Sequence, residues 1–138
     1  MNDLRYDQLT LGMRADFQTT VSADSVDGFA RLSGDHSPLH MDRDFAVAAG
    51  HPDRVVHGML SASLFSTLVG VHLPGRNALF HGIKASFHRP IYPGMPLSVG
   101  GEIVYLNEAY RQIEIKASIL GPDGKKHVSA VLKVGLTA

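Results

Sequence analysis

Asp35 and His40 are two side chains of this sequence that could move protons together. They lie five residues apart in the segment Ser33–Asp42. An ionised aspartate accepts hydrogen bonds, whereas histidine can accept or donate, so the pair could orient one water, take a proton from it and deliver a proton elsewhere. Pro38 fixes its own backbone torsion and favours an extended conformation at Ser37, which stiffens the loop where these side chains must be aimed. The segment therefore predicts the site of a proton-transfer enzyme.

A second candidate feature is the dipeptide His57-Gly58, which begins a long uncharged segment. The first turn of a helix has free backbone N–H groups and partial positive charge, and glycine lets a ligand approach the backbone closely. A thioester carbonyl docked at Gly58 would be polarised there, as in an oxyanion hole. A protonated imidazole is unfavourable at the same helix end, so we expect His57 to be neutral.

Short helices are predicted on both sides of the loop that carries the proton-transfer pair. Ser22 is placed to cap the first helix, which should end near Gly34. Asp42 can cap the second helix, which should run through Ala49 and stop at Gly50. These two helices would hold the loop at both ends.

The segment from Gly58 to Leu73 has small or apolar residues on every side of a helical wheel, which is typical of a buried helix. An extended segment precedes it near residues 15–21, and strand-like segments separated by turn residues follow at 78–88, 97–106, 109–120 and 126–136. The segment 109–120 alternates apolar and polar residues, so we expect a sheet with one dry face. These elements predict an α+β fold in which an antiparallel sheet wraps around a buried central helix.

The bulk composition narrows the function. The chain has 138 residues, 44% of them hydrophobic, which suits one domain over residues 1–138. Thirteen basic residues balance 13 acidic ones, and no Lys/Arg run indicates a nucleic-acid partner. No apolar run reaches the roughly 20 residues that span a bilayer, and segment 1–7 lacks the apolar core of a secretory signal. Because there is no cysteine, the composition fits a reducing compartment, and we expect a cytoplasmic protein without a membrane partner.

Terminal strands of such a sheet would leave open hydrogen-bonding edges. Proteins commonly cover such edges by pairing with another subunit. We therefore expect a homodimer.

Three motifs in order resemble a known family. They are FARLSGDHSPLHMDRDFA at Phe29–Ala46, VHGML at Val56–Leu60 and LPG at Leu73–Gly75. Together they resemble the MaoC-like, (R)-specific enoyl-CoA hydratase (hydratase 2) family, and the resemblance covers residues 14–136. It implies a single hot-dog domain, a homodimer, no cofactor, and reversible hydration of trans-2-enoyl thioesters to (R)-3-hydroxyacyl thioesters.

The resemblance also implies roles for individual residues. Asp35 and His40 match the catalytic pair of the family, Gly58 matches its oxyanion-hole glycine, and Ser66 matches a serine near the acyl pocket. We assign His40 as the base that activates water and Asp35 as the group that protonates C2, although the two could share these roles. The substrate would be an acyl thioester of coenzyme A or of acyl carrier protein.

Ser37 and His57 complete the predicted substrate-binding residues. The family usually has asparagine at the position of Ser37. Serine can still donate and accept a hydrogen bond, but its side chain is shorter, so the bracing of the loop or the fit of the substrate would differ.

Other functions fit parts of the same pattern. His36 and His40 are four residues apart, but no third ligand has helical metal-site spacing and Pro38 interrupts the segment, so no metal site is predicted. A hot-dog thioesterase commonly carries a carboxylate on the central helix, and residues 59–73 contain none. A dehydratase acting on acyl carrier protein or another specialised thioester, and a non-catalytic acyl-CoA-binding module, stay open as alternatives.

Overall fold

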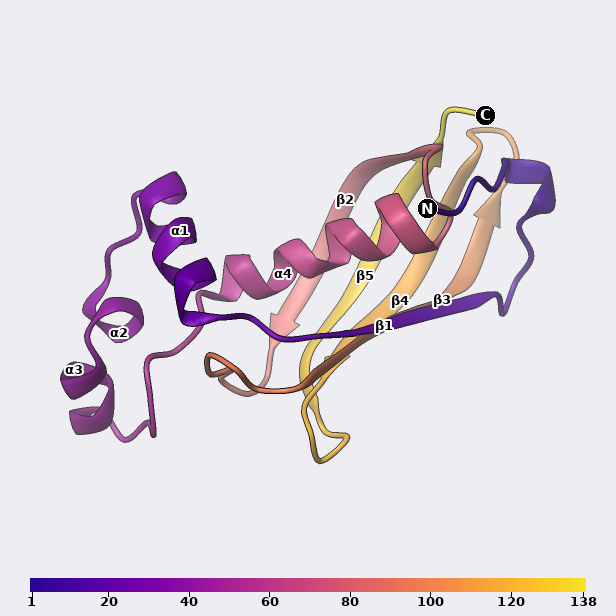
Figure 1. Ribbon diagram of the computed structural model, residues 1–138. Helices are drawn as coiled ribbons and strands as arrows, with labels where there is room; N and C mark the ends of the chain where they lie inside the picture. The colour runs from indigo at the N-terminus through magenta and orange to yellow at the C-terminus, as the bar shows by residue number, and fades with distance from the viewer.

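The computed structural model describes residues 1–138, and its main element is one antiparallel five-stranded sheet (Figure 1). The order of the strands is β1-β3-β4-β5-β2, so β1 and β2 form the two edges. The strands are β1 (Arg14–Thr19), β2 (Ala78–Phe87), β3 (Leu97–Asn107), β4 (Gln112–Leu120) and β5 (Lys126–Leu136). The predicted antiparallel sheet is confirmed.

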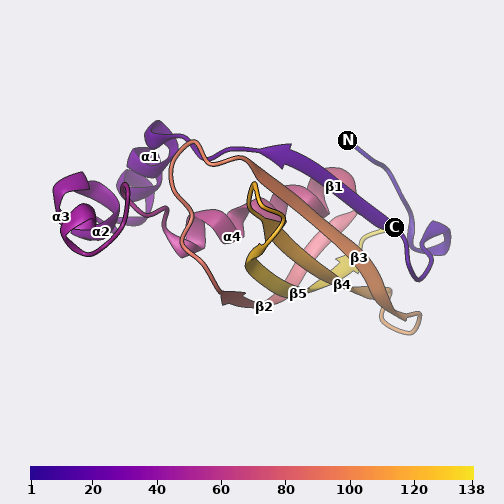
Figure 2. The same cartoon turned by 90° about the horizontal axis from the view of Figure 1, so that it is seen from below.

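A central helix lies along one face of this sheet, which we call the inner face (Figures 1 and 2). This helix, α4 (Gly58–Thr67), continues into a π-helical turn at Leu68–His72. A sheet that wraps along one central helix is the α+β hot-dog fold expected from the sequence. None of the helices combines the length and the apolar character required to cross a membrane.

Three short helices connect β1 to α4. They are α1 (Ala23–Ser33), α2 (Pro38–Met41) and α3 (Arg43–Ala48), and a 3₁₀ turn at Tyr6–Gln8 precedes β1. The three helices gather at one end of the molecule, beyond the N-terminus of α4 (Figure 1). This placement brings the loop between α1 and α2 close to the first turn of α4.

The predicted helix caps are confirmed. The Ser22 hydroxyl accepts a hydrogen bond from Ser25 N–H at 3.1 Å, and Gly34 ends α1 with a φ of 81°. The Asp42 carboxylate accepts from Phe45 N–H at 3.2 Å at the start of α3. Glycine adopts such a positive φ without steric cost, so the chain can reverse direction directly before the Asp35 loop.

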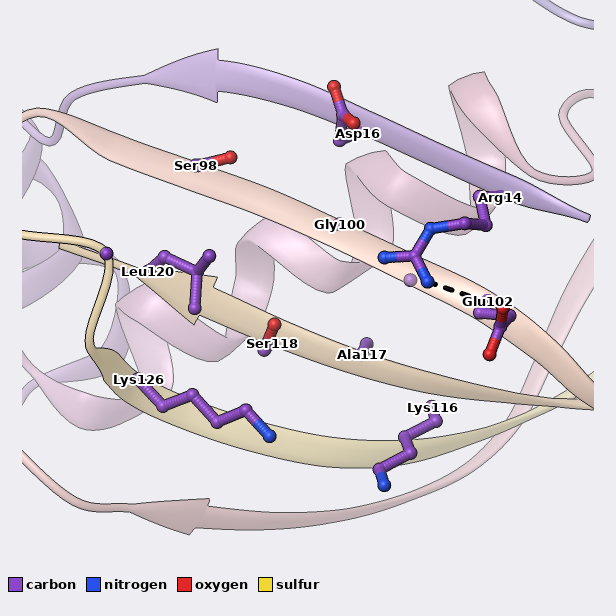
Figure 3. Close-up of a pocket in the computed structure, with 12 residues that line it drawn as sticks. Arg14, Asp16, Ser98, Gly100, Glu102, Lys116, Ala117, Ser118, Leu120 and Lys126 are labelled. Atoms are coloured by element: carbon purple, nitrogen blue, oxygen red, sulfur yellow. Dashed lines mark hydrogen bonds and ion pairs between the residues drawn. The ribbon is translucent and has the colours of Figure 1, made fainter. Parts of the chain in front are cut away.

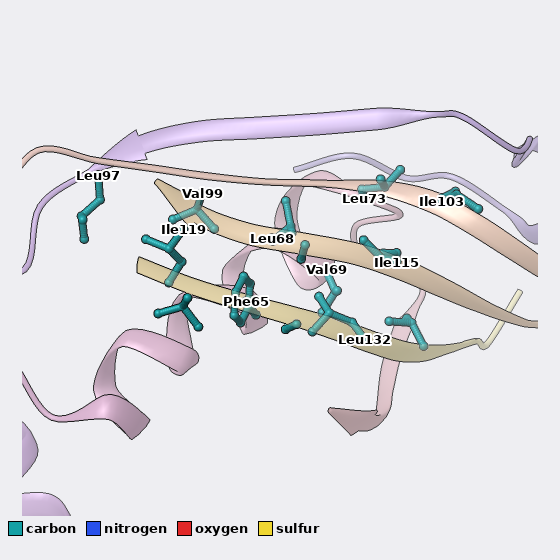
Figure 4. Packing of buried hydrophobic residues seen from close by; sticks show 14 of the residues in the cluster. Phe65, Leu68, Val69, Leu73, Leu97, Val99, Ile103, Ile115, Ile119 and Leu132 are labelled. Atoms are coloured by element: carbon teal, nitrogen blue, oxygen red, sulfur yellow. The ribbon is translucent and has the colours of Figure 1, made fainter. Parts of the chain in front are cut away.

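The core lies between α4 and the inner face. Phe65 and Leu68 are fully buried and pack in a cluster of 21 buried residues (Figure 4). β4 alternates as predicted, and its inward residues are all buried: Ile113, Ile115, Ala117 and Ile119. Burial of apolar area of this kind is the main stabilising term of a small domain.

Two local predictions need correction. The loop that carries the proton-transfer pair contains a helical turn, α2, because Pro38 suits the first position of a helix. The strand predicted to begin at residue 109 begins at Gln112, because a turn precedes it in which Arg111 has a φ of 46°. Neither correction changes which residues of β4 face the core.

The central helix is not buried on every side of the single chain. Its exposed residues are uncharged and recur at helical spacing: Met59, Ser63, Ser66 and Thr67. Beside them, Ile83 and Phe87 of β2 are 47% and 50% exposed on the inner side of the edge strand. The sequence predicts a helix buried on all sides, but one uncharged face of α4 is exposed in the single chain. This face lies next to the free edge of β2.

Gly101 allows the helix and sheet to approach closely. A Cβ atom at Gly101 would lie 2.6 Å from Ile115 Cγ2 and 3.2 Å from Leu68 Cδ2. We expect Gly101→Ala to lower the free energy of unfolding by about 1–3 kcal/mol because it overpacks the core. Denaturant titration measures this change. Gly82→Ala on β2, where the nearest atom is 3.8 Å away, is the matched control and should change stability by less than about 0.5 kcal/mol. Equal stability of the two variants would contradict the prediction.

Candidate active site

Asp35, His40 and Gly58 come together where the α1–α2 loop meets the first turn of α4. Asp35 lies in the loop, His40 lies on α2, and Gly58 begins α4. His40 and Gly58 both line a hollow of about 270 Å³. The other lining residues are Val55, Val56, Ser61, Phe87, His88, Arg89, Pro90, Ile91 and Val128.

The predicted proton-transfer pair is assembled by the fold. His40 Nε2 lies 3.8 Å from Asp35 Oδ2, and the side chains are 15% and 49% exposed. This separation is longer than a direct hydrogen bond but short enough for both atoms to bond one water molecule. The arrangement can therefore take a proton from a water and return one nearby.

A backbone carbonyl sets the tautomer of His40. His40 Nδ1 lies 2.7 Å from the carbonyl oxygen of Val55. Because a carbonyl oxygen only accepts, Nδ1 carries the proton in the neutral ring, and Nε2 presents a lone pair toward Asp35. Arg54, directly before Val55, donates to Asp27 Oδ1 of α1 at 2.7 Å, and this hydrogen bond lowers the pKa of Asp27. The ion pair thus holds the segment that orients His40.

The aim of Asp35 is set by its own loop. Ser37 N–H donates to Asp35 Oδ1 at 3.1 Å, while Asp35 N–H donates to Ser33 Oγ at 3.2 Å. These local bonds leave Oδ2 directed toward His40. The structure uses the backbone of Ser37 here, and its exposed hydroxyl makes no hydrogen bond within the chain.

His57 lies beneath the pair rather than on the surface of the hollow. Its side chain is 2% exposed, and its ring stacks on that of His40 with a centroid distance of 4.0 Å. His57 Nε2 lies 3.0 Å from the carbonyl oxygen of Asp35, so Nε2 carries the proton. Nδ1 is buried without a hydrogen-bond partner. The neutral ring expected from the sequence stays a prediction.

Gly58 is positioned for close contact with a ligand. Its N–H lies in the first turn of α4, where backbone N–H groups have no intrahelical acceptor. A Cβ atom at this position would lie 3.2 Å from the Phe87 ring, so only glycine leaves the backbone accessible beside this side chain. The helix dipole adds partial positive charge at the same point.

The structure separates Ser66 from these residues and adds others. Ser66 is exposed two turns along α4 and does not line the hollow, so its substrate-binding role stays a prediction. Ser61 does line the hollow, and its hydroxyl donates to Gly58 carbonyl at 2.6 Å. Segment 87–90 also contributes, but it comes from the end of β2. No local sequence signal could have placed this segment beside α4.

The same groups offer possible metal ligands. One ligand atom each of Asp35, His40 and His57 lies within 4.8 Å of the others. The two imidazole planes are stacked and only 26° apart, so their in-plane lone pairs do not converge on one point. His57 Nε2 is also occupied by its bond to Asp35. The expectation of no metal site stays a prediction.

The two histidine tautomers can be measured. At about pH 8, above the ordinary histidine pKa, we expect His40 to carry its proton on Nδ1 and His57 on Nε2. Long-range proton–nitrogen NMR spectra distinguish these forms, and His40→Gln and His57→Gln variants assign the signals. The same tautomer on both rings would contradict the geometry.

Comparison with known proteins places this site in a family. A model of the MaoC like domain matches residues 8–120. An (R)-specific enoyl-CoA hydratase of Aeromonas caviae is 39% identical over 72% of this chain and 75% of its own length. A mitochondrial 3-hydroxyacyl-[acyl-carrier-protein] dehydratase of Arabidopsis thaliana is 35% identical over 69% of this chain and 52% of its own length. The solved (R)-hydratase structure from A. caviae superposes with a TM-score of 0.89 and 34% identity, covering 93% of this chain and 97% of that one.

The chain therefore belongs to the MaoC-like domain family, and the resemblance inferred from its three motifs is confirmed. The superposition with the solved (R)-hydratase structure confirms the hot-dog fold. The roles of the individual site residues stay predictions, and the geometry described above is the observation that supports them.

Proposed function

We propose that this chain catalyses reversible hydration of trans-2-enoyl thioesters to (R)-3-hydroxyacyl thioesters. The observation that carries this proposal is the 3.8 Å separation of Asp35 Oδ2 and His40 Nε2 beside the free helix N-terminus at Gly58. The relatives from A. caviae and A. thaliana are named as a hydratase and a dehydratase of thioesters, which describes the same chemistry in its two directions. The reaction class is that of a hydro-lyase.

In the hydration direction, His40 Nε2 takes a proton from the water that it shares with Asp35. The water oxygen bonds to C3 of the enoyl thioester, and the electron pair of the double bond moves to the carbonyl oxygen. The resulting enolate is stabilised by Gly58 N–H and the dipole of α4. The proton held by His40 Nε2 passes to the Asp35 carboxylate, and the carboxyl group formed in this way protonates C2. One water is consumed, and both side chains regain their initial protonation states.

Removal of either proton-transfer group should abolish most activity. We expect Asp35→Asn and His40→Asn each to lower kcat for crotonyl-CoA by about 10²- to 10⁴-fold, because each loses general acid–base function while keeping a similar shape. Loss of enoyl absorbance measures turnover. Asp24→Asn, an exposed position in the first turn of α1, is the matched control. Near-normal turnover in both site variants would overturn the assignment, and release of free thiol without hydration would indicate a thioesterase.

The chain is also proposed to act as a homodimer of single domains spanning residues 1–138. Only one side of β2 is paired, and its free edge can pair with a second copy about a two-fold axis. The exposed Ile83 and Phe87 lie at this edge beside the uncharged face of α4. Such a contact would cover both apolar surfaces at once. A cytoplasmic location stays a prediction from composition.

The dimer proposal predicts a difference between two lysine substitutions. Ile83→Lys should shift the chain toward monomer, because it places a charge in the proposed contact. Val104→Lys, at a similarly exposed position on β3, should stay dimeric; the native side chains are 47% and 44% exposed. Analytical ultracentrifugation measures the oligomeric state of both variants and of the parent protein. A monomeric parent protein, or equal behaviour of the two variants, would contradict this interface.

A further inference from the structure

The outer face of the sheet, opposite α4, carries a hollowed basic surface that the proposed reaction does not use. Two adjoining hollows of about 500 and 240 Å³ lie on this face and share Lys116, Ala117 and Lys126. Figure 3 shows the larger one. Lys84 lines the smaller hollow from β2. Positive side chains from three strands therefore surround one surface depression, which we call the lysine hollow.

The positions of the lysines follow from the strand register. Lys84 and Lys116 both pair with Val131 of β5, from opposite sides, so all three residues point to the same face. Lys126 lies near the start of β5 and extends over the same surface as Lys116 (Figure 3).

None of these three lysines takes part in an ion pair. Two carboxylates, Asp16 and Glu102, also line the larger hollow, and Glu102 is the register partner of Lys116 but is paired with Arg14 at 3.3 Å. Like charges held close together repel one another, and an anion would relieve that repulsion. The charge pattern therefore favours an anionic ligand at the lysine hollow.

Hydroxyl groups lie between the lysines. Ser86, Ser129 and Ser118 are register partners on three adjacent strands and form a row across the outer face. Their side chains are small enough to leave room above the sheet and can donate hydrogen bonds to an anion. Ammonium and hydroxyl donors on one surface are the combination that binds phosphate oxygens.

The lysine hollow is connected to the candidate active site through His88. His88 lines the hollow at Gly58, and its Nε2 lies 2.7 Å from Ser129 Oγ, which lines the lysine hollow. Phe87 faces the inner side and Ser86 the outer side at the same end of β2. A ligand that leaves the active site past His88 would thus reach the lysines. Pairing of two β2 edges would leave the outer face uncovered.

We propose that the lysine hollow binds the phosphate groups of the coenzyme A part of the substrate. This inference rests on the proposed hydration of acyl thioesters. Coenzyme A carries a diphosphate and a 3′-phosphate, whose negative charges complement Lys84, Lys116 and Lys126. The hollow is sized for a small molecule rather than for a protein surface, so it selects coenzyme A over acyl carrier protein as the source of the thioester.

The test compares thioesters with and without these phosphates. In the double variant Lys116→Gln/Lys126→Gln, the KM for crotonyl-CoA should rise about tenfold with little change in kcat, because charge-assisted bonds to phosphate are lost. The KM for crotonyl-pantetheine, which lacks phosphate, should not change. Lys133→Gln, on the same face of β5 beside Glu114, should leave both KM values within about twofold.

Several outcomes would overturn the inference. An unchanged KM for crotonyl-CoA, or an equal rise for both thioesters, would remove any role in phosphate binding. A rise in KM for crotonyl-acyl carrier protein alone would assign the lysines to a protein partner instead. Calorimetric titration with free coenzyme A tests the hollow even if no thioester is hydrated. About tenfold weaker binding to the double variant is then expected, and equal binding would contradict the proposal.

Discussion

The packing of α4 against the inner face of the sheet is the constraint on which the other features depend. Phe65 and Leu68 are fully buried there, and Gly101 lets the helix and sheet approach closely. This packing fixes the direction of the helix axis, so its N-terminus is held at the end of the sheet next to Phe87. A backbone N–H that must stabilise developing charge is useful only if it does not move during the reaction. A helix packed into the core therefore presents the N–H group that is proposed to stabilise the enolate.

A single buried residue couples this helix end to the proton-transfer pair. His57 directly precedes Gly58, bonds the backbone of Asp35 through Nε2, and stacks on the ring of His40. One side chain that solvent barely reaches therefore links the proposed acid, the proposed base and the proposed oxyanion donor.

Much of this arrangement could be predicted from local sequence, but the assembled site could not. The caps at Ser22 and Asp42 and the alternation of β4 depend on neighbouring residues, and the structure confirms these predictions. The stacking of His57 on His40, the contact of Phe87 with Gly58 and the grouping of three lysines depend on long-range pairing. The register of β2, β4 and β5, which groups the lysines, is decided by packing across the whole sheet. The exposed face of α4 could not be predicted for a related reason: an uncharged helix predicts burial, but not whether the same chain covers it.

The hydrogen bond from His40 Nδ1–H to the Val55 carbonyl restricts where protons can travel. With Nδ1 occupied, the imidazole cannot accept a proton at one nitrogen and release it to bulk solvent from the other. Every proton that enters the ring must leave through Nε2, on the side that faces Asp35. In the proposed reaction, oxygen and hydrogen are then delivered from the same side of the double bond. The stereochemistry of addition would follow from one carbonyl oxygen that never touches the substrate.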